Sequence, residues 1–350
     1  MIQDFPPILT HICLYNCKNL QTLPQLPPNL ERINLSSCKK LKMIPKLSHS
    51  VENLLFLSNC VNLYMIQDFP PILTHICLYN CKNLQTLPQL PPNLERINLS
   101  SCKKLKMIPQ LPQKLTSLEA RNCVSLEKVP NLSKCSGLYE LDFSGCRKLK
   151  EIQGWENLHS LWILKLGGTP HNIVSNNNIK ELLIGPKLES DFTCTLTCNE
   201  VPSWIRCKEE GSLLSFQWPL NNSENYTMGF LGLFFWVVLK ARALPDRDVV
   251  VSIQINGLGV KIYGYEIQYE VEEISFLHWS PRDDLDNGLG THIKVGEVMK
   301  VTIDETQVKA RMVKRIGVVA LYRNTDGFVQ FVPITKVGLT TKKRKRNFRG

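Results

Sequence analysis

The chain has 350 residues, of which 43% are hydrophobic and 21% are charged, and its formal net charge at pH 7 is +11. This composition is typical of globular proteins and excludes a chain that is disordered throughout. The length is sufficient for two domains that each have a hydrophobic core.

The amino-terminal sequence MIQDFPPILTHI lacks the basic and apolar regions of a secretory signal. The most apolar stretch, residues 229–239, is shorter than the roughly 20 residues that cross a bilayer, so we expect no membrane span. The 13 cysteines are then expected to be free thiols in a reducing compartment. We predict a cytoplasmic location.

Residues 1–47 recur at 65–111 with one difference, Lys46 against Gln110. A cysteine returns about every 21 residues, at Cys17, Cys38, Cys60, Cys81, Cys102, Cys123 and Cys146. The apolar residues around each cysteine follow the pattern L-x-x-L-x-L-x-x-C-x-x-L. This pattern predicts an α/β leucine-rich-repeat solenoid of eight or nine units over residues 1–192, with short parallel strands and an irregular convex side.

The repeat also predicts where each kind of side chain lies. Alternate strand residues point inward and stack on the next unit, and the small cysteine side chain packs as a buried ladder that donates to backbone carbonyls. The segments that lead from one strand to the next, here called returns, are rich in proline, as in LPQLPPNL. Proline favours extended backbone on the outer face.

Residues between the inward positions are expected to form two rungs on the concave face. The central rung is Cys13, Asn34, Phe56, Cys77, Asn98, Glu119, Asp142 and Lys165. The neighbouring rung is Tyr15, Ser36, Ser58, Tyr79, Ser100, Arg121, Ser144 and Gly167. Aromatic and arginine side chains anchor protein interfaces, and charged ones discriminate between partners. The candidate partner-binding residues are therefore Tyr15, Phe56, Tyr79, Glu119, Arg121, Asp142 and Lys165.

After residue 192 the repeat stops and β-rich runs begin, separated by turn signals such as Asn256-Gly257. The runs are SLLSFQW from Ser212, GFLGLFFWVVL from Gly229, VVVSIQI from Val249, VKIYGYEI from Val260 and IGVVALYR from Ile316. They predict an all-β antiparallel sandwich over residues 193–337.

The segment CNEVPSWIRCKEEGSLLSFQWP, residues 198–219, resembles the opening of the jelly-roll/immunoglobulin-like domain that follows the repeats in plant TIR-type nucleotide-binding leucine-rich-repeat immune receptors. The matching residues are Cys198, Pro202, Trp204, Gly211, Ser212 and Phe216. The resemblance implies a recognition module that binds a pathogen effector or host protein and contributes to defence. It also implies a carboxy-terminal piece of a larger receptor, because no G-x-x-x-x-G-K-[ST] phosphate loop is present.

Neither catalysis nor a cofactor is expected. The cysteine pairs Cys13–Cys17, Cys77–Cys81 and Cys194–Cys198 lack the four converging ligands of a closed zinc site. The seven histidines accompany no nucleophile motif such as G-x-S-x-G. We therefore predict no enzyme activity and no metal.

The last 13 residues, 338–350, are predicted to be a disordered tail. Its basic run is a candidate nuclear-import signal formed by Lys342, Lys343, Arg344, Lys345 and Arg346. Two alternative functions stay open. One is an extracellular leucine-rich-repeat receptor ectodomain, and the other is a nucleic-acid-associated factor that acts through this tail.

Overall fold

The computed structural model separates the chain into two compact units. The first consists of Met1–Asn199, Lys240–Asp246 and Ile267–His278, and the second of Glu200–Leu239, Arg247–Glu266 and Trp279–Gly350. The structure describes residues 5–51, 53–173, 179, 192–198, 200–217, 229–240, 248–249, 252–255, 258–261, 265–266, 273–281, 285, 298–304, 313–323, 328–332, 334 and 336–337. The predicted tail with Lys342 to Arg346 lies outside these residues.

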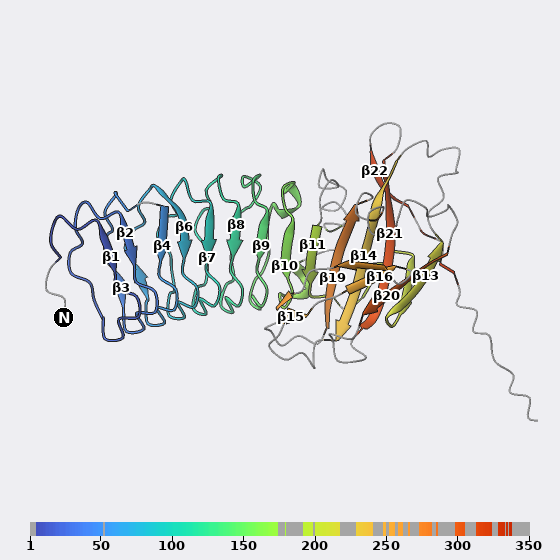
Figure 1. The fold of residues 1–350 in the computed structure, drawn as a ribbon, viewed down its shortest axis with the longest axis horizontal. Helices are drawn as coiled ribbons and strands as arrows, with labels where there is room; N and C mark the ends of the chain where they lie inside the picture. The colour runs from blue at the N-terminus through green and yellow to red at the C-terminus, as the bar shows by residue number, and fades with distance from the viewer. Residues whose placement is uncertain are drawn as a thin grey trace, which may run out of the picture. The chain divides into compact units, whose positions relative to one another are not determined.

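The first unit contains a parallel solenoid of stacked coils, each of which contributes one short strand to a continuous sheet (Figure 1). Every neighbouring pair of these strands is parallel. The strands are β1 (His11–Cys13), β2 (Arg32–Asn34), β4 (Asn53–Phe56), β6 (Leu73–Cys77), β7 (Arg96–Asn98), β8 (Ser117–Glu119), β9 (Glu140–Asp142), β10 (Ile163–Leu166) and β11 (Phe192–Leu196).

On the outer side, short extended segments pair between some neighbouring coils. β3 (Met43–Ile44) pairs in parallel with β5 (Met65–Ile66), and Met107, three coils beyond Met43, bridges Lys128 in parallel. Within residues 5–173, apart from position 52, the only helix is the 3-10 turns η1 (Trp155–Asn157) and η2 (His171–Ile173).

The prediction of an α/β solenoid was therefore wrong, and the first unit is built mostly of strands. The physical reason lies in the returns. A coil of about 21 residues contains a strand and several turns, so few residues remain for a helix. Prolines in those returns lack an amide hydrogen and cannot take part in helical hydrogen bonding beyond the first turn.

The core is a set of stacked ladders that run along the solenoid. Ile33, Leu55 and Ile97 are at most 2% exposed, and each lies at the middle of its strand register. Burying a side chain of this size stabilises the fold by about 1.5–3 kcal/mol. No coil can bury its own ladder residue alone, so the coils stabilise one another.

The predicted cysteine ladder is confirmed. Cys60 Sγ donates to the carbonyl oxygen of Leu35 at 3.1 Å, and Cys102 Sγ donates to that of Leu78 at 3.3 Å. The same bond to the preceding coil is made by Cys38, Cys81, Cys123 and Cys146. Each of these carbonyl oxygens also accepts a backbone amide, as Leu35 does from Cys38 at 3.2 Å, so the thiol is a second donor that ties one coil to the next.

One residue before each ladder cysteine, the backbone adopts a left-handed conformation. The residues with positive φ at this position are Asn16, Ser37, Asn59, Asn80, Ser101, Asn122 and Gly145. Asparagine, serine and glycine are there because a side chain with a bulky Cβ substituent is disfavoured in the left-handed region. The bend directs the chain off the strand and places the cysteine inside.

The described strands of the second unit form antiparallel sheets. One sheet contains β12 (Cys207–Glu210), β14 (Phe230–Lys240), β21 (Val313–Arg323) and β22 (Val329–Val332). Another contains β13 (Leu213–Gln217), β16 (Ser252–Ile255), β17 (Leu258–Lys261) and β20 (Val298–Asp304). A hairpin-like pair joins β15 (Asp248–Val249) to β18 (Tyr265–Glu266). Each of the five predicted β-rich runs contains a strand, and β19 (Glu273–Pro281) adds another that is divided between the two units.

Aromatic side chains fill the interior of this unit. The Trp204 ring lies edge-on to Trp236 with 6.4 Å between centroids, and it lies 4.8 Å from Phe331. Phe234 lies 4.6 Å from Trp279, whose side chain is fully buried. Such pairs stabilise a core beyond the area that they bury.

Candidate functional site

One face of the solenoid's parallel sheet, which the repeat pattern predicts to be the concave face, carries the central rung in the predicted register. Adjacent members are Cα partners in the pairs Cys13–Asn34, Asn34–Phe56, Phe56–Cys77, Cys77–Asn98, Asn98–Glu119, Glu119–Asp142 and Asp142–Lys165. Because strand side chains alternate in direction, a register error of one residue would have turned all of these side chains inward. The strand register of the rung is as predicted, but Asp142 on it is buried.

Three of the predicted contact residues are exposed aromatic side chains. Tyr15 is 62% exposed, Tyr79 is 43% exposed and Phe56 is 39% exposed. Large apolar rings on one face of a rigid scaffold offer contact area at a low cost in conformational entropy. These three residues form the part of the prediction that the geometry favours most.

The charged candidates at the other end of the face contact one another. Glu119 Oε2 accepts a hydrogen bond from Asn98 Nδ2 at 3.0 Å, and Lys165 Nζ lies 4.0 Å from Asp142 Oδ2. Asp142 is 5% exposed, and its Oδ1 accepts a 2.8 Å hydrogen bond from the Ser144 amide. Asp142 could therefore act on a binding partner through its charge, but it offers almost no surface for direct contact.

Burial raises the pKa of both carboxyl groups in this cluster. For Glu119, the second cause is the negative charge of Glu140 and the third is that of Asp142. For Asp142, Lys165 opposes the effect of burial. Arg121, half-buried on the neighbouring rung, also lowers the pKa of Glu119. The cluster is a negative patch whose charge is partly compensated by Lys165 and Arg121.

A third rung, which the sequence reasoning missed, lies two residues before the central one in each strand. It consists of His11, Arg32, Leu54, His75, Arg96, Ser117, Glu140 and Ile163. The signal was available, because strand residues two apart face the same side. In the first five strands this rung is basic and apolar.

The central and third rungs of the first coils line a hollow of about 460 Å³ on this face. It is lined by His11, Ile12, Cys13, Arg32, Ile33, Asn34, Leu54 and Phe56. Leu54 and Phe56 form an apolar wall, and Arg32 and Asn34 present polar groups beside it. A hollow with an apolar wall and a few polar groups is typical of a binding site.

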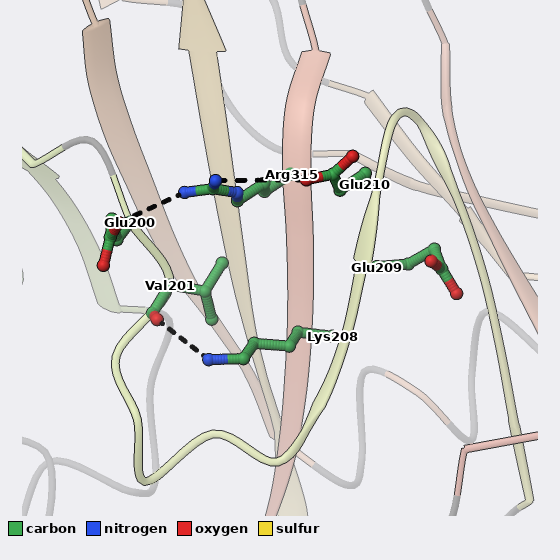
Figure 2. A pocket seen from close by; sticks show the side chains of 6 residues that line it. All are labelled: Glu200, Val201, Lys208, Glu209, Glu210 and Arg315. Atoms are coloured by element: carbon green, nitrogen blue, oxygen red, sulfur yellow. Dashed lines mark hydrogen bonds and ion pairs between the residues drawn. The ribbon is translucent and has the colours of Figure 1, made fainter.

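A second hollow, of about 360 Å³, lies in the second unit (Figure 2). The Arg315 guanidinium extends between Glu200 and Glu210, at 3.7 and 4.0 Å, and Lys208 Nζ donates to the Val201 carbonyl oxygen at 3.4 Å. Its charged groups therefore already contact one another, which leaves little unbalanced charge for a ligand.

None of the 13 cysteines forms a disulfide bond. Among the described residues, no group of three or more histidine, cysteine, aspartate or glutamate side chains is arranged to hold a metal ion. Burial raises the pKa of Cys60 and Cys102 to about 12, whereas Cys13 is exposed on the central rung. The buried thiols are structural, since the thiolate is the reactive form.

In the part of the chain that the structure describes, no helix has the length and apolar character needed to cross a membrane. No protein-family model and no curated protein sequence matches this chain.

Proposed function

We propose that this chain recognises a partner protein through the concave face of its solenoid. The observation that carries the proposal is the row of exposed rings, Tyr15, Phe56 and Tyr79, which project from a regularly spaced parallel sheet. Solenoids stack rigid repeats into extended surfaces of this kind, and the side chains of such a surface can vary without disturbing the core. The chain's part in this proposal is binding, without catalysis.

We further propose that the recognition takes place inside plant cells, as part of a TIR-type nucleotide-binding leucine-rich-repeat immune receptor. Support comes from the repeat pattern and from the resemblance of residues 198–219 to the opening of that family's terminal jelly-roll/immunoglobulin-like domain. The antiparallel strands and the packing of Trp204 against Trp236 are compatible with such a sandwich. The partner is then a pathogen effector or a host protein.

Site-specific photo-crosslinking in a plant cell tests this proposal. Benzoylphenylalanine replaces Tyr79 on the concave face or, as the control, Met107, which is 52% exposed and lies outside the solenoid's main sheet. We expect one partner protein to cross-link from Tyr79 and not from Met107, and Tyr79→Ala to weaken its capture without changing the melting temperature. Equal cross-linking from both positions would contradict a concave binding face.

A further inference from the structure

The 64-residue duplication places the same strand, Arg-Ile-Asn, in two different environments. Its copies are β2 (Arg32–Asn34) and β7 (Arg96–Asn98), and they have the same burial pattern. In both copies the asparagine Oδ1 accepts a hydrogen bond from the amide two residues later, Ser36 at 3.0 Å and Ser100 at 2.9 Å. The two copies therefore present the same groups in the same geometry.

In the second copy, groups of the chain itself contact those side chains. Asn98 Nδ2 donates to Glu119 Oε2 at 3.0 Å, and the Arg96 guanidinium carbon lies 5.8 Å from the centre of the Tyr139 ring. The first contact is a hydrogen bond to a carboxylate, and the second has the geometry of a cation–π interaction. A carboxylate and an aromatic ring are thus the natural complement of this strand.

In the first copy, both complementary groups are replaced. On the next strand, the Cα partner of Asn98 is Glu119, whereas the Cα partner of Asn34 is Phe56. Tyr139 lies two coils beyond Arg96 and directly precedes Glu140. The equivalent residue two coils beyond Arg32 is Thr74, which directly precedes His75 and has no ring. Among the described residues, no carboxylate pairs with Arg32 and no group accepts a hydrogen bond from Asn34 Nδ2. These side chains line the 460 Å³ hollow instead.

We propose that this hollow binds a segment of the partner protein in which an acidic side chain lies next to an aromatic one. The carboxylate accepts from Asn34 as Glu119 does from Asn98, and the ring lies against Arg32 as Tyr139 does against Arg96, beside the apolar wall of Leu54 and Phe56, which are 41% and 39% exposed. The inference rests on the proposed function, since it names the chemistry of the partner that the concave face recognises.

The charge pattern of the face supports this orientation. In β1, β2, β4, β6 and β7 the three rungs contain Arg32 and Arg96 and no carboxylate, whereas β8 and β9 contribute Glu119, Glu140 and Asp142. An acidic segment is attracted to the first coils and repelled from the carboxylate cluster. A nucleic acid phosphate would also be attracted by Arg32, but the internal copy shows a carboxylate, and the apolar wall suits a ring better than a sugar-phosphate chain.

The test uses the full chain and fluorescence anisotropy with a fluorescein-labelled peptide of sequence Gly-Ser-Gly-Glu-Phe-Glu-Gly-Ser-Gly. We expect the Gln-Phe-Gln and Glu-Ala-Glu analogues to bind at least about tenfold more weakly. Arg32→Gln should weaken binding of the parent peptide by about tenfold, whereas the matched variant Arg96→Gln, at the equivalent exposed position, should change it less than twofold. Phe56→Glu, which supplies the carboxylate of the second copy, should abolish binding while the melting temperature is kept.

Three results would overturn this inference: equal losses in Arg32→Gln and Arg96→Gln, tighter binding of decathymidylate than of the peptide, or no peptide binding at all. If the cross-links from Tyr79 persist in any of these cases, the inference fails and the proposed concave recognition stands. If those cross-links are also absent, both fail.

Discussion

Gly145 lies directly against Asn122 of the preceding coil, so that a Cβ added to the glycine would be 2.3 Å from Asn122 Oδ1. Gly145 also has a φ of +73°, and it ends the series of left-handed residues that begins with Asn16. This contact shows how closely successive coils approach one another where the chain leaves each strand.

Gly145→Ala is therefore expected to destabilise the solenoid by at least about 1–2 kcal/mol, because the left-handed backbone disfavours a Cβ and the side chain of Asn122 must also move. Chemical unfolding measures the change. Gly137→Ala is the matched control, since no atom lies within 4 Å of its added Cβ. Equal stabilities of the two variants would contradict the importance of the contact.

The buried thiols predict that stability falls at alkaline pH. The pKa of Cys60 is raised by burial from 9.0 to about 12, so the unfolded chain releases this proton above pH 9 while the folded chain retains it. The stabilisation is complete below pH 9 and is lost as the pH rises toward 12, by about 1.4 kcal/mol per pH unit for one thiol. Urea unfolding at pH 8, 9 and 10 measures the slope.

Cys60→Ala should make this slope shallower, although the variant is less stable at pH 8 because the Leu35 carbonyl loses one of its two donors and keeps only the Cys38 amide. Cys13→Ala serves as the control for removal of a thiol that is exposed instead of buried. Alkylation with iodoacetamide at pH 8 should label Cys13 and leave Cys60 unmodified until the protein unfolds. Early labelling of Cys60 would argue against a buried ladder.

The carboxylate cluster predicts a stabilising substitution. Because burial, Glu140 and Asp142 raise the pKa of Glu119 above 4.5, its charge opposes folding at neutral pH. Stability from this group is greatest below pH 4.5 and falls as the pH rises through the raised pKa. Glu119→Gln should raise the melting temperature at pH 7, with Asn98 still able to donate to the amide oxygen, and the gain should vanish below pH 4.5.

Glu127 provides the control, because its pKa is shifted in the opposite direction to that of Glu119. Its carboxylate lies 2.9 Å from Lys150 Nζ, and the hydrogen bond from Lys150 lowers its pKa. The stability that it contributes is present above pH 4.5 and is lost as the pH falls through the lowered pKa, so Glu127→Gln should slightly lower the melting temperature at pH 7. A rise in both variants would show that loss of negative charge in general, and not the cluster, is responsible.

The second unit contains a close approach at Gly317 of β21. An added Cβ would lie 2.6 Å from Val201 Cγ1 and 3.0 Å from Ile205 Cγ2, and both side chains are buried. Gly317→Ala should destabilise this unit by roughly 1–3 kcal/mol through overpacking. Tryptophan fluorescence, which reports on Trp204 and Trp236, follows the unfolding.

Combination with Val201→Ala should recover much of this loss, because the smaller side chain leaves room for the added methyl group. A double-mutant cycle gives the interaction energy between the two positions. Additive losses would mean that Val201 moves aside without cost, which would contradict the tight packing.

The repeat register and the strand positions could be predicted from the sequence because both depend on local periodicity. A 21-residue period and two-residue alternation within each strand determine that Phe56 and Tyr79 face out while Ile33 and Leu55 face in. The proline-rich returns indicated extended backbone on the outer face, but the α/β class was wrong, because the leucine pattern is compatible with several backbone paths on that side. The third rung, which contains Arg32 and Arg96, was missed although its two-residue spacing from the central rung was visible in the sequence.

The sequence by itself determined that this protein is a solenoid, since an apolar pattern repeated in register can be buried only by stacking coil on coil. Only the tertiary structure decided which of two identical strands is available to a partner. Arg32 and Arg96 have the same neighbours along the chain, but contacts to the following coils differ, with Phe56 in one copy and Glu119 in the other. Whether a polar group already has a hydrogen-bond partner depends on the atoms around it in space. The residues next to it in a repeated sequence do not specify those atoms.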